Sequence, residues 1–443
     1  MKLFVYQVLS TLAGLLGWPY FYWHLKSRGR GESFLPRLGL KLPPDPPSGS
    51  PRIWIHGVSV GEVLSALPLV QELQRFLPQV SLTISTGTET GQAVARRHFL
   101  PLGVQVCYYP LDLPWAVHRY LNRLRPDIYI SLDSEIWPNF LSSAHKRGVR
   151  LALLNARLSD QSFTRLLKYR RYIIDIIKLY DVIAAGSTQD YQRFRTLGIP
   201  AAKIYNTGNL KIDRLMQMRE EKGEGKIKAG GTGVSPVPPL ATFLGLADHP
   251  VFLAASTHAG EEEVVLAAYK ELKAPYPALL LLLAPRHPER AGEIGRLLEE
   301  RGLPYHLWQR LKSGEETRTR PVVLIDTIGD LFSLYGVADV AFVGGSLVPH
   351  GGQNILEAAA WGLAPLYGPH LENFRWAQAM LEEAGAGLLI QDAPSLTAAA
   401  QRLLDHPDLR QDLGRRAQSA LIPHQGAAKR QATLVADLLN KAN

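Results

Sequence analysis

The sequence predicts an α/β protein made of two doubly wound domains of similar size. Short apolar runs alternate with helical patterns along most of the chain, which is typical of βαβ units and parallel sheets. The alternation stops once, at the Gly- and Pro-rich residues 223–239, and then resumes, so this stretch is expected to be a flexible loop. A length of 443 residues also favours two domains.

Two series of apolar runs predict the strands of the two sheets. The first series is RIWIHG, VSLTISTGT, VQVCYYP, DIYISLD, RLALLNA and VIAAGS. The second series is VFLAAS, ALLLLLAPR, VVLIDT, VAFVGG, APLYGP and GLLIQD. We therefore expect an N-terminal domain over residues 31–220, a flexible linker or insertion over 221–245, and a C-terminal domain over 246–443 that ends in a helix.

The composition narrows the class of protein. The single cysteine, Cys107, excludes an intrachain disulfide and suits a reducing compartment. The histidines are scattered and show no Cys/His spacing that is typical of zinc sites. A net charge of +9 favours acidic partners such as anionic lipids or phosphorylated substrates. No nucleic-acid-binding motif is present, so nucleic acid is not expected as a partner.

Residues 1–30 predict a membrane anchor with a basic flank. Residues 3–25 contain few polar side chains and are about as long as a membrane span. Aromatic residues gather near the end of this segment, and basic residues follow them, so the positive-inside rule places the rest of the chain in the cytoplasm. A cleaved signal peptide and an amphipathic helix that lies on the membrane are the alternatives.

The heptapeptide HGVSVGE, residues 56–62, connects the first predicted strand with a helical pattern. Ser59 and Glu62 fit the S-x-x-E capping box, in which each side chain bonds a free backbone N–H group of the first turn. Glu62 is also suited to act as a catalytic base at the end of a strand. The first turn of a helix lowers the pKa of a carboxylate, whereas burial raises it.

Further polar residues follow the later strands of the first domain. Asp133 and Glu135 follow DIYISL, Asn155 and Arg157 lie in NARLSDQS, and Lys211 lies in TGNLKID. Surface caps, an ion pair or turns are the structural explanations for these residues. Because the chain has no D-x-D pair of aspartates here, a metal-bridged nucleotide-sugar site is not indicated.

In the second domain, residues 340–362 combine a strand, a glycine-rich loop and a helical pattern. Such a loop can bind phosphate, because backbone N–H groups converge at the start of the helix. Gly345 and Ser346 open the loop, and Asn354 and Glu357 have the spacing of a helix cap. A tight structural turn explains the loop about as well.

The segment LAPRHPER ends another predicted strand of the second domain. Arg286 and Arg290 place two guanidinium groups, with His287 between them in sequence, at the rim of the sheet. Guanidinium groups are suited to bidentate capture of phosphate. A solvated loop before a capped helix is the alternative. Two more strands end in polar residues, in ASTHAGEEE and DTIGDLF, which folding alone explains poorly.

Taken together, the motifs HGVSVGE, SEIWPN, NARLS, GNLKID, ASTHAGEE, PRHPER, GDLFSLYGVADVAFVGGSLVPHGGQN and GPHLENF resemble those of the 3-deoxy-D-manno-oct-2-ulosonic acid (Kdo) transferases of lipopolysaccharide synthesis. The resemblance covers nearly the whole chain. It implies a GT-B fold, with two Rossmann-like domains facing across a cleft, an N-terminal anchor in the inner membrane, and no metal or other cofactor. It also implies an inverting transfer of Kdo from CMP-Kdo to a lipid A precursor, lipid IVA.

The resemblance also assigns roles to residues. Glu62 matches the family's catalytic base, and Glu135 matches a second acidic residue on the acceptor side. The expected donor-binding residues lie in the second domain and are Arg286, His287, Gly345, Ser346, Asn354 and Glu357. The residues expected to bind the acceptor or support the cleft are Ser59, Asp133, Asn155, Arg157 and Lys211.

The chain departs from the family pattern at a few positions. The family usually has GGHNPLEPAA where this chain has GGQNILEAAA, so Gln353 replaces a histidine, and Ile355 and Ala358 replace prolines. Asp133 stands where the family often has glutamate. Two other functions remain open: a sugar-nucleotide epimerase of the same fold, and a catalytically inactive, membrane-docked protein that binds a nucleotide sugar.

Overall fold

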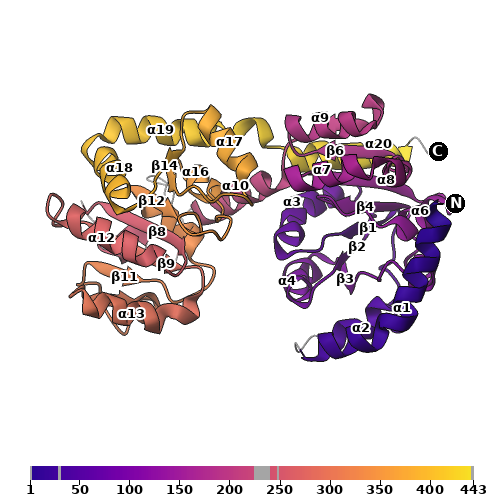
Figure 1. Ribbon diagram of the computed structural model, residues 1–443, viewed down its shortest axis with the longest axis horizontal. Helices are drawn as coiled ribbons and strands as arrows, with labels where there is room; N and C mark the ends of the chain where they lie inside the picture. The colour runs from indigo at the N-terminus through magenta and orange to yellow at the C-terminus, as the bar shows by residue number, and fades with distance from the viewer. Residues whose placement is uncertain (1, 28–30, 224–239, 247–248, 441–443) are drawn as a thin grey trace. The chain divides into compact units, whose positions relative to one another are not determined.

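A computed structural model describes residues 2–27, 31–223, 240–246 and 249–440, and the chain divides into two compact units (Figure 1). Unit 1 comprises Met1–Arg214 and His424–Asn443, and unit 2 comprises Leu215–Pro423. Nearly all of the expected flexible loop, residues 224–239, lies outside the described residues. Each unit contains one parallel sheet with helices on both faces, which confirms the predicted α/β class.

The sheet of unit 1 has seven parallel strands in the order β3-β2-β1-β4-β5-β6-β7. The strand order reverses beside β1, so β1 and β4 lie at the switch point where ligands bind in open α/β sheets. The strands are β1 Arg52–His56, β2 Ser81–Thr86, β3 Gln105–Tyr108, β4 Ile128–Leu132, β5 Arg150–Ala156, β6 Val182–Ala185 and β7 Ile204–Asn206.

Both faces of this sheet are covered, so its strands are apolar on both sides. Ile53 and Ile55 face one core together with residues of α3, α4 and α20, whereas Trp54 faces the other core with residues of α5, α6, α8 and α9. The helices of unit 1 are α1 Lys2–Ser27, α2 Phe34–Arg37, α3 Val60–Phe76, α4 Glu89–Phe99, α5 Pro114–Leu124, α6 Pro138–His145, α7 Asp160–Lys168, α8 Arg170–Ile177, α9 Thr188–Leu197 and α20 Ala427–Asn440; α10 Leu210–Gly223 begins in unit 1 and continues into unit 2.

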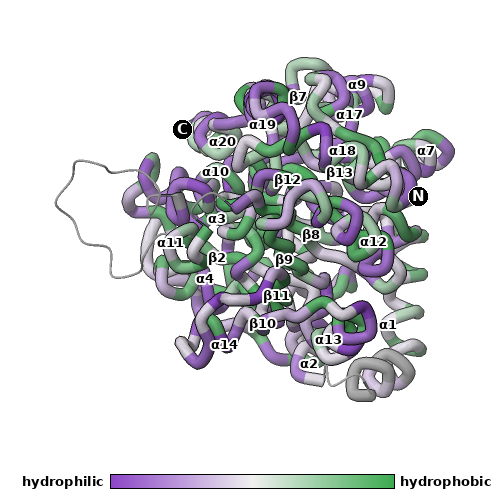
Figure 2. Tube along the Cα trace, turned by 90° about the vertical axis from the view of Figure 1, so that its left-hand side faces the viewer, coloured by the Kyte–Doolittle hydropathy of each residue, from purple (hydrophilic) through white to green (hydrophobic). Residues whose placement is uncertain are grey.

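The sheet of unit 2 also has seven parallel strands, in the order β10-β11-β9-β8-β12-β13-β14. Figure 2 shows hydrophobic residues along β8, β9 and β11, as expected for strands that are buried on both faces. The strands are β8 Val251–Thr257, β9 Leu280–Pro285, β10 Tyr305–Leu307, β11 Val322–Leu324, β12 Val340–Val343, β13 Pro365–Tyr367 and β14 Leu388–Leu389.

The helices of unit 2 pack on both faces of its sheet. Residues of α12, α13 and α18 share one core with Phe252 and Phe342, and residues of α14 and α16 share the other core with Leu253. The helices are α11 Leu240–Phe243, α12 Glu261–Lys273, α13 Ala291–Glu300, α14 Trp308–Ser313, α15 Leu331–Leu334, α16 Leu356–Ala360, α17 Arg375–Glu383, α18 Ala393–Asp405 and α19 Pro407–Ser419.

The final helix, α20, belongs to unit 1, whereas the sequence assigned it to the C-terminal domain. Ala428, Ala432 and Val435 pack in the core that α3 covers. Asp213 accepts hydrogen bonds from the N–H groups of Gly426 and Ala428, both at 2.7 Å. Sequence proximity suggested the wrong domain because the chain crosses back into unit 1 near His424.

The N-terminal helix α1 packs on unit 1. The Tyr6 hydroxyl donates to Asp112 Oδ2 at 3.0 Å, and Asn139 Nδ2 donates to Ser10 Oγ at 3.1 Å. A side chain at Gly14 would collide with Leu113, so this glycine allows a close approach. Among the described residues, no helix combines the length and the apolar character that crossing a bilayer requires. The expected spanning anchor is therefore not confirmed.

Candidate active site

Glu62 lies in the first turn of α3, at the end of β1, and caps its own helix. Val58 N–H donates to Oε2 at 2.7 Å and the Ser59 hydroxyl donates to Oε1 at 2.8 Å, while Glu62 N–H donates to Ser59 Oγ at 3.3 Å. These bonds confirm Ser59 as the N-cap, whereas the Glu62 carboxylate bonds the N–H of Val58, one residue before the N-cap, instead of the Ser59 N–H of a full capping box. The Glu62 side chain is only partly buried, so capping does not seal it from solvent.

The pKa of Glu62 is raised above its ordinary value. Burial is the main cause, and the charge of Asp133 adds to the rise. The hydrogen bonds from Val58 and Ser59 and the charge of Lys211 oppose it. Burial therefore outweighs the effect of the helix start, and the carboxylate is a better proton acceptor than an ordinary glutamate.

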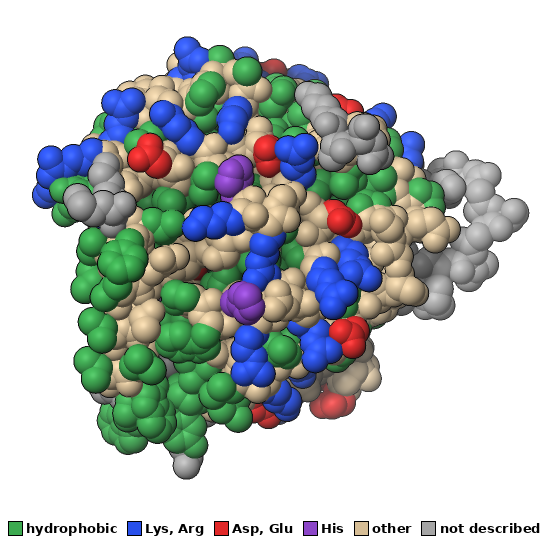
Figure 3. Space-filling view, turned by 90° about the vertical axis from the view of Figure 1, so that its right-hand side faces the viewer, with side chains coloured by type: hydrophobic (Ala, Val, Ile, Leu, Met, Phe, Trp, Pro, Cys, Tyr) green, Lys and Arg blue, Asp and Glu red, His purple; other side chains and the backbone are tan. Residues whose placement is uncertain are grey.

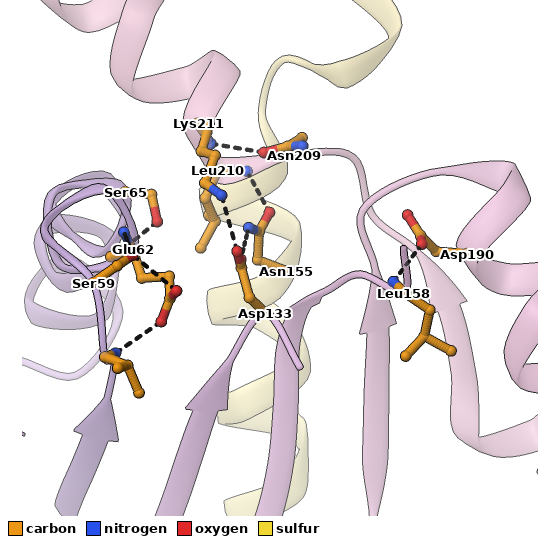
Figure 4. Close-up of polar contacts among 11 residues, drawn as sticks. Ser59, Glu62, Ser65, Asp133, Asn155, Leu158, Asp190, Asn209, Leu210 and Lys211 are labelled. Carbon is orange, nitrogen blue, oxygen red and sulfur yellow. Dashed lines mark hydrogen bonds and ion pairs between the residues drawn. The ribbon is translucent and has the colours of Figure 1, made fainter. Parts of the chain in front are cut away.

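Asp133, which follows β4, and Lys211, in the first turn of α10, form an ion pair beside Glu62 (Figure 4). Lys211 Nζ lies 2.9 Å from Asp133 Oδ2, and Asn155 Nδ2 donates to Asp133 Oδ1 at 2.6 Å. Leu210 N–H donates to Asn155 Oδ1 at 2.9 Å, so Asn155 connects β5 with α10. The structure thus brings Glu62, Asp133, Asn155 and Lys211 together.

Glu135 is the other acidic residue of this region. Burial raises its pKa to about 7, and the charges of Glu62 and Asp133 contribute to the rise. The hydroxyl of the buried Tyr180 donates to the Glu135 carbonyl at 3.0 Å and lies 3.0 Å from Ser131 Oγ, which fixes the backbone at this position. Two carboxylates with raised pKa values in one place are typical of a functional site.

Arg157 directly follows β5, and its side chain lies near Gly186 and Asp190. Its Cγ would contact a side chain added at Gly186, and its charge acts on Asp190. Asp190 in turn accepts a hydrogen bond from Leu158 N–H at 2.8 Å, in the part of Figure 4 away from Glu62. The backbone of Arg157 reaches the cluster, because its N–H donates to the Asp133 carbonyl at 3.1 Å.

In unit 2, the buried side chain of Glu261 organises the glycine-rich loop after β12. Its Oε2 accepts from His258 N–H at 2.9 Å and Gly345 N–H at 2.7 Å, and its Oε1 accepts from Ser346 N–H at 3.0 Å and Leu347 N–H at 2.9 Å. The carboxylate is fully buried. Glu261 was not among the residues that the motifs predict, although three successive glutamates at a helix start were a signal for it.

These bonds correct one expectation for the loop. The N–H groups of Gly345 and Ser346 donate to Glu261. They are therefore not directed at a phosphate, although the sequence suggested that they would bind one. A buried carboxylate that belongs to the chain itself satisfies these donors. Gly345 has a φ of +65°, and a side chain there would lie 3.2–3.3 Å from atoms of His258 and Gln353.

The two arginines after β9 have different surroundings. Arg290 forms ion pairs with Glu262 and Glu293, both at 2.8 Å, so it ties the end of β9 to α12. Arg286 is exposed, and within residues 249–440 its guanidinium makes no ion pair or hydrogen bond. His287 lies 3.2 Å from Glu289. Arg286 is therefore the arginine that remains available to a ligand.

Asn354 and Glu357 lie at the start of α16, although the cap differs from the expected one. The helix begins at Leu356 with Ile355 as its N-cap residue, because Asn354 Oδ1 accepts from Leu356 N–H at 3.3 Å and forms a local turn. Asn354 Nδ2 donates to Glu357 Oε1 at 3.3 Å. Burial raises the pKa of Glu357 to about 7, and Asn354 and the charges of Arg286 and Lys222 oppose the rise.

Comparison with known proteins identifies relatives over most of the chain. Residues 32–214 match the family model of 3-deoxy-D-manno-octulosonic-acid transferase (kdotransferase). The 3-deoxy-D-manno-octulosonic acid transferase of Haemophilus influenzae is 36% identical over 399 residues, which cover 89% of this chain and 88% of that protein. The enzyme of the same name from Bordetella pertussis is 34% identical over 94% of both chains.

Solved structures of lower identity share the fold. UDP-GlcNAc 2-epimerase from Neisseria meningitidis has a TM-score of 0.60 at 15% identity, covering 88% of this chain and all of that one. MurG from Acinetobacter baumannii has a TM-score of 0.52 at 14% identity, covering 87% of this chain and 99% of that chain. At such identities the likeness concerns architecture and not activity. The sequence relatives decide the family: the chain belongs to the 3-deoxy-D-manno-octulosonic acid transferases, which are glycosyltransferases.

Proposed function

We propose that this protein transfers Kdo from CMP-Kdo to a lipid A precursor, with inversion at the anomeric carbon and with Glu62 as the base. The observation that carries the proposal is the raised pKa of a solvent-reachable carboxylate at the switch point of the unit 1 sheet. Relatives that are 34–36% identical are 3-deoxy-D-manno-octulosonic acid transferases, which supports the choice of donor sugar.

In the proposed reaction a hydroxyl oxygen of the acceptor attacks the anomeric carbon of Kdo. A carbon–oxygen bond forms to the acceptor, the bond between the anomeric carbon and the phosphate oxygen of CMP breaks, and the hydroxyl proton passes to Glu62. The leaving group is CMP. Positioned proton transfer of this kind contributes a factor of roughly 10²–10⁴ to the rate.

The neighbours of Glu62 tune this base. Asp133 raises the pKa of Glu62 and Lys211 lowers it, so the ion pair between them limits the repulsion that Glu62 experiences. Glu135, with a pKa of about 7, carries a proton in part of the molecules at neutral pH. In that form it can donate a hydrogen bond to the acceptor or to the reacting sugar.

The donor nucleotide is proposed to bind unit 2. Arg286 supplies an exposed guanidinium for the phosphate. Asn354 and Glu357 lie at the start of α16, and the charge of Arg286 acts on Glu357, so their side chains can bond ribose hydroxyl groups. Glu261 would act indirectly, because it holds the loop that precedes Asn354.

The helix α1 is proposed to lie on a bilayer surface and to bring the enzyme to its lipid acceptor. One side of α1 is fixed to unit 1 through Tyr6 and Ser10. Large apolar side chains elsewhere on the helix are exposed, and Figure 3 shows hydrophobic side chains gathered along one edge of this face of the molecule. These exposed residues are Phe4, Val5, Val8, Leu9, Leu12, Leu15, Leu16, Trp18 and Trp23. Such a surface suits the headgroup region of a membrane.

The test is the variant Glu62→Gln, compared with Ser59→Ala in initial-rate assays with CMP-Kdo and a tetra-acylated lipid A precursor. Glu62→Gln removes the proton acceptor and is expected to lower kcat by roughly 10²–10⁴. Ser59→Ala weakens the helix cap but keeps the carboxylate, so it is expected to keep most of the activity.

The proposal fails if Glu62→Gln has a kcat comparable with that of the parent enzyme while Glu62→Gln and Ser59→Ala both lose thermal stability. Glu62 would then serve only as a helix cap. The same assay tests the alternative that the chain is an inactive binding protein. Under that alternative, the parent chain binds CMP but forms no product. Product with inverted configuration is the outcome that supports the proposal.

A further inference from the structure

Three imidazole rings lie together at the carboxyl ends of three strands of unit 2. His258 follows β8, His287 follows β9, and His350 lies in the loop after β12. The rings of His258 and His350 are stacked, with centroids 4.4 Å apart and planes at 22°. His287 meets His258 edge-on at 5.9 Å. The sequence motifs assign no role to His258 or His350.

The His258 ring is held in one orientation by its surroundings. The absence of a side chain at Gly345 leaves room for the ring, because an added Cβ would lie 3.2 Å from it. Gln353 Nε2 lies 3.2 Å from His258 Nε2. An amide nitrogen can only donate, so His258 Nε2 accepts this bond and the proton of the neutral ring resides on Nδ1, which is left as a hydrogen-bond donor.

The charges around His258 are mostly positive. His350, His287, Arg286 and Arg290 all act on it, and together with burial, the largest cause, they lower its pKa to about 4. The opposing carboxylates are engaged elsewhere: Glu262 and Glu293 pair with Arg290, Glu289 pairs with His287, and Glu261 is bonded to backbone N–H groups.

This leaves an excess of positive charge at a place where ligands bind in such sheets. Within the described part of unit 2, neither His258 nor His350 forms an ion pair with a carboxylate. An anionic group of a ligand would supply the missing partner, and it would favour the charged form of the His258 imidazole.

We propose that His258 and His350, next to Arg286, form a subsite for the carboxylate of the donor sugar. This inference rests on the proposed function. A 2-ulosonic acid carries its carboxylate on the anomeric carbon, and in the donor that same carbon bears the phosphate of CMP. The two anionic groups of the donor are therefore close neighbours, and the subsite for the carboxylate must adjoin the phosphate site that we assign to Arg286.

The test compares two ligands that differ by the sugar: CMP-Kdo, which carries the carboxylate, and CMP, which lacks it. The KM for CMP-Kdo and the inhibition constant of CMP are measured for the parent enzyme and for His258→Gln and His350→Gln. Loss of a charge-assisted contact is expected to raise the KM for CMP-Kdo roughly tenfold. The inhibition constant of CMP is expected to stay within about twofold of the parent value.

The matched control is His406→Gln, which changes an exposed histidine of the same unit at the junction of α18 and α19 and is expected to alter neither constant. A parallel rise of both constants would mean that the imidazoles bind the nucleotide, and unchanged constants would mean that they bind neither ligand; each result overturns the proposal. Because His350 is exposed, its variant is expected to fold even where His258→Gln does not.

An absence of transfer by the parent enzyme would contradict the proposed function and not the subsite. In that event, calorimetric titration with CMP-Kdo and CMP gives the same comparison without turnover. A weaker affinity of His350→Gln for CMP-Kdo alone supports the subsite, and equal effects on both ligands overturn it.

Discussion

Lys211 Nζ lies 2.9 Å from Asp133 Oδ2, and this ion pair lies beside the Glu62 carboxylate. The contact joins the end of β4 to the start of α10, two elements that are 78 residues apart in sequence. It also places one cation among three acidic side chains, those of Glu62, Asp133 and Glu135. The protonation of the proposed base therefore depends on Lys211.

Replacing Lys211 with methionine is expected to move the acidic limb of the pH–kcat/KM profile to higher pH. The positive charge of Lys211 lowers the pKa of Glu62, so its loss leaves burial and Asp133 to raise that pKa further. More of the enzyme then carries a protonated, inactive Glu62 at each pH on that limb. Activity should fall most at the acidic end of the profile and recover as the pH rises.

The variant Lys211→Arg keeps the charge and serves as the control for this experiment. It is expected to retain an acidic limb close to that of the parent enzyme. If both variants lose activity equally at every pH, Lys211 acts through its shape or its contact with the substrate rather than through the pKa of Glu62.

Replacing Glu261 with glutamine is expected to weaken CMP binding without removing a group that touches the ligand. An amide side chain has one oxygen, so its NH₂ group would face two of the four backbone N–H donors that the carboxylate now satisfies. The loop that leads to Asn354 should then adopt its ligand-binding conformation in a smaller fraction of molecules. The apparent Kd for CMP rises by the inverse of that fraction.

Calorimetric titration with CMP checks this expectation, with a rise in Kd of about tenfold as the predicted size. Glu263→Gln, an exposed neighbour in the same helical turn, is the matched control and should leave the Kd unchanged. A Kd for Glu261→Gln equal to that of the parent, at a lowered thermal midpoint, would show that Glu261 stabilises unit 2 without positioning the ligand loop.

The architecture could be predicted from the sequence because apolar runs of strand length and capping signals are local. The runs around Ile53, Ile130 and Leu282 lie in buried strands of the structure, and Ser59 caps α3 as its spacing indicated. The position of α20 could not be predicted in this way, because packing against α3 joins segments that are more than 350 residues apart in sequence.

The candidate site shows the same limit. The motifs located Glu62, Asp133 and Lys211, yet the ion pair and the direction of the Glu62 pKa depend on distances between strand ends. The glycine-rich loop was recognised as a nest of N–H groups, whereas its occupant, Glu261, follows a different strand. A side chain of the chain itself and a phosphate satisfy such a nest equally well, so its composition alone does not reveal which one is bound.

Replacing Glu135 with glutamine is expected to stabilise the protein at alkaline pH. Burial and the Glu62 charge raise the pKa of Glu135 to about 7 in the folded protein, above its value near 4.3 in an unfolded chain. Between these values the folded state binds a proton that the unfolded state lacks, so the free energy of unfolding falls as the pH rises. Glutamine removes this dependence.

Chemical denaturation at pH 5 and pH 8 measures the effect. The gain of Glu135→Gln over the parent should be about 1–3 kcal/mol larger at pH 8 than at pH 5. Glu263→Gln, which also removes one acidic side chain, controls for the change in net charge. An equal difference between variant and parent at both pH values would mean that Glu135 does not bind a proton in this range.

Replacing Leu9, Leu12 and Leu16 of α1 with serine is expected to release the protein from membranes and to leave its binding of CMP unchanged. Leu9, Leu12 and Leu16 are each at least 48% exposed and lie in the helix that Tyr6 and Asp112 hold to unit 1. Removing three exposed apolar side chains reduces the area that can enter the headgroup region, and each buried leucine contributes about 1.5–3 kcal/mol to such a transfer. Flotation with liposomes of phosphatidylethanolamine and phosphatidylglycerol should therefore show a large loss of bound protein.

The control variant changes Leu100, Leu389 and Ile422, which are also more than half exposed but lie outside α1. It should float with the vesicles as the parent does. The α1 variant should keep its affinity for CMP, because Arg286 and Asn354 lie in unit 2, and should lose transfer to an acceptor that is embedded in vesicles. Unchanged flotation of the α1 variant would rule out this face as the membrane contact.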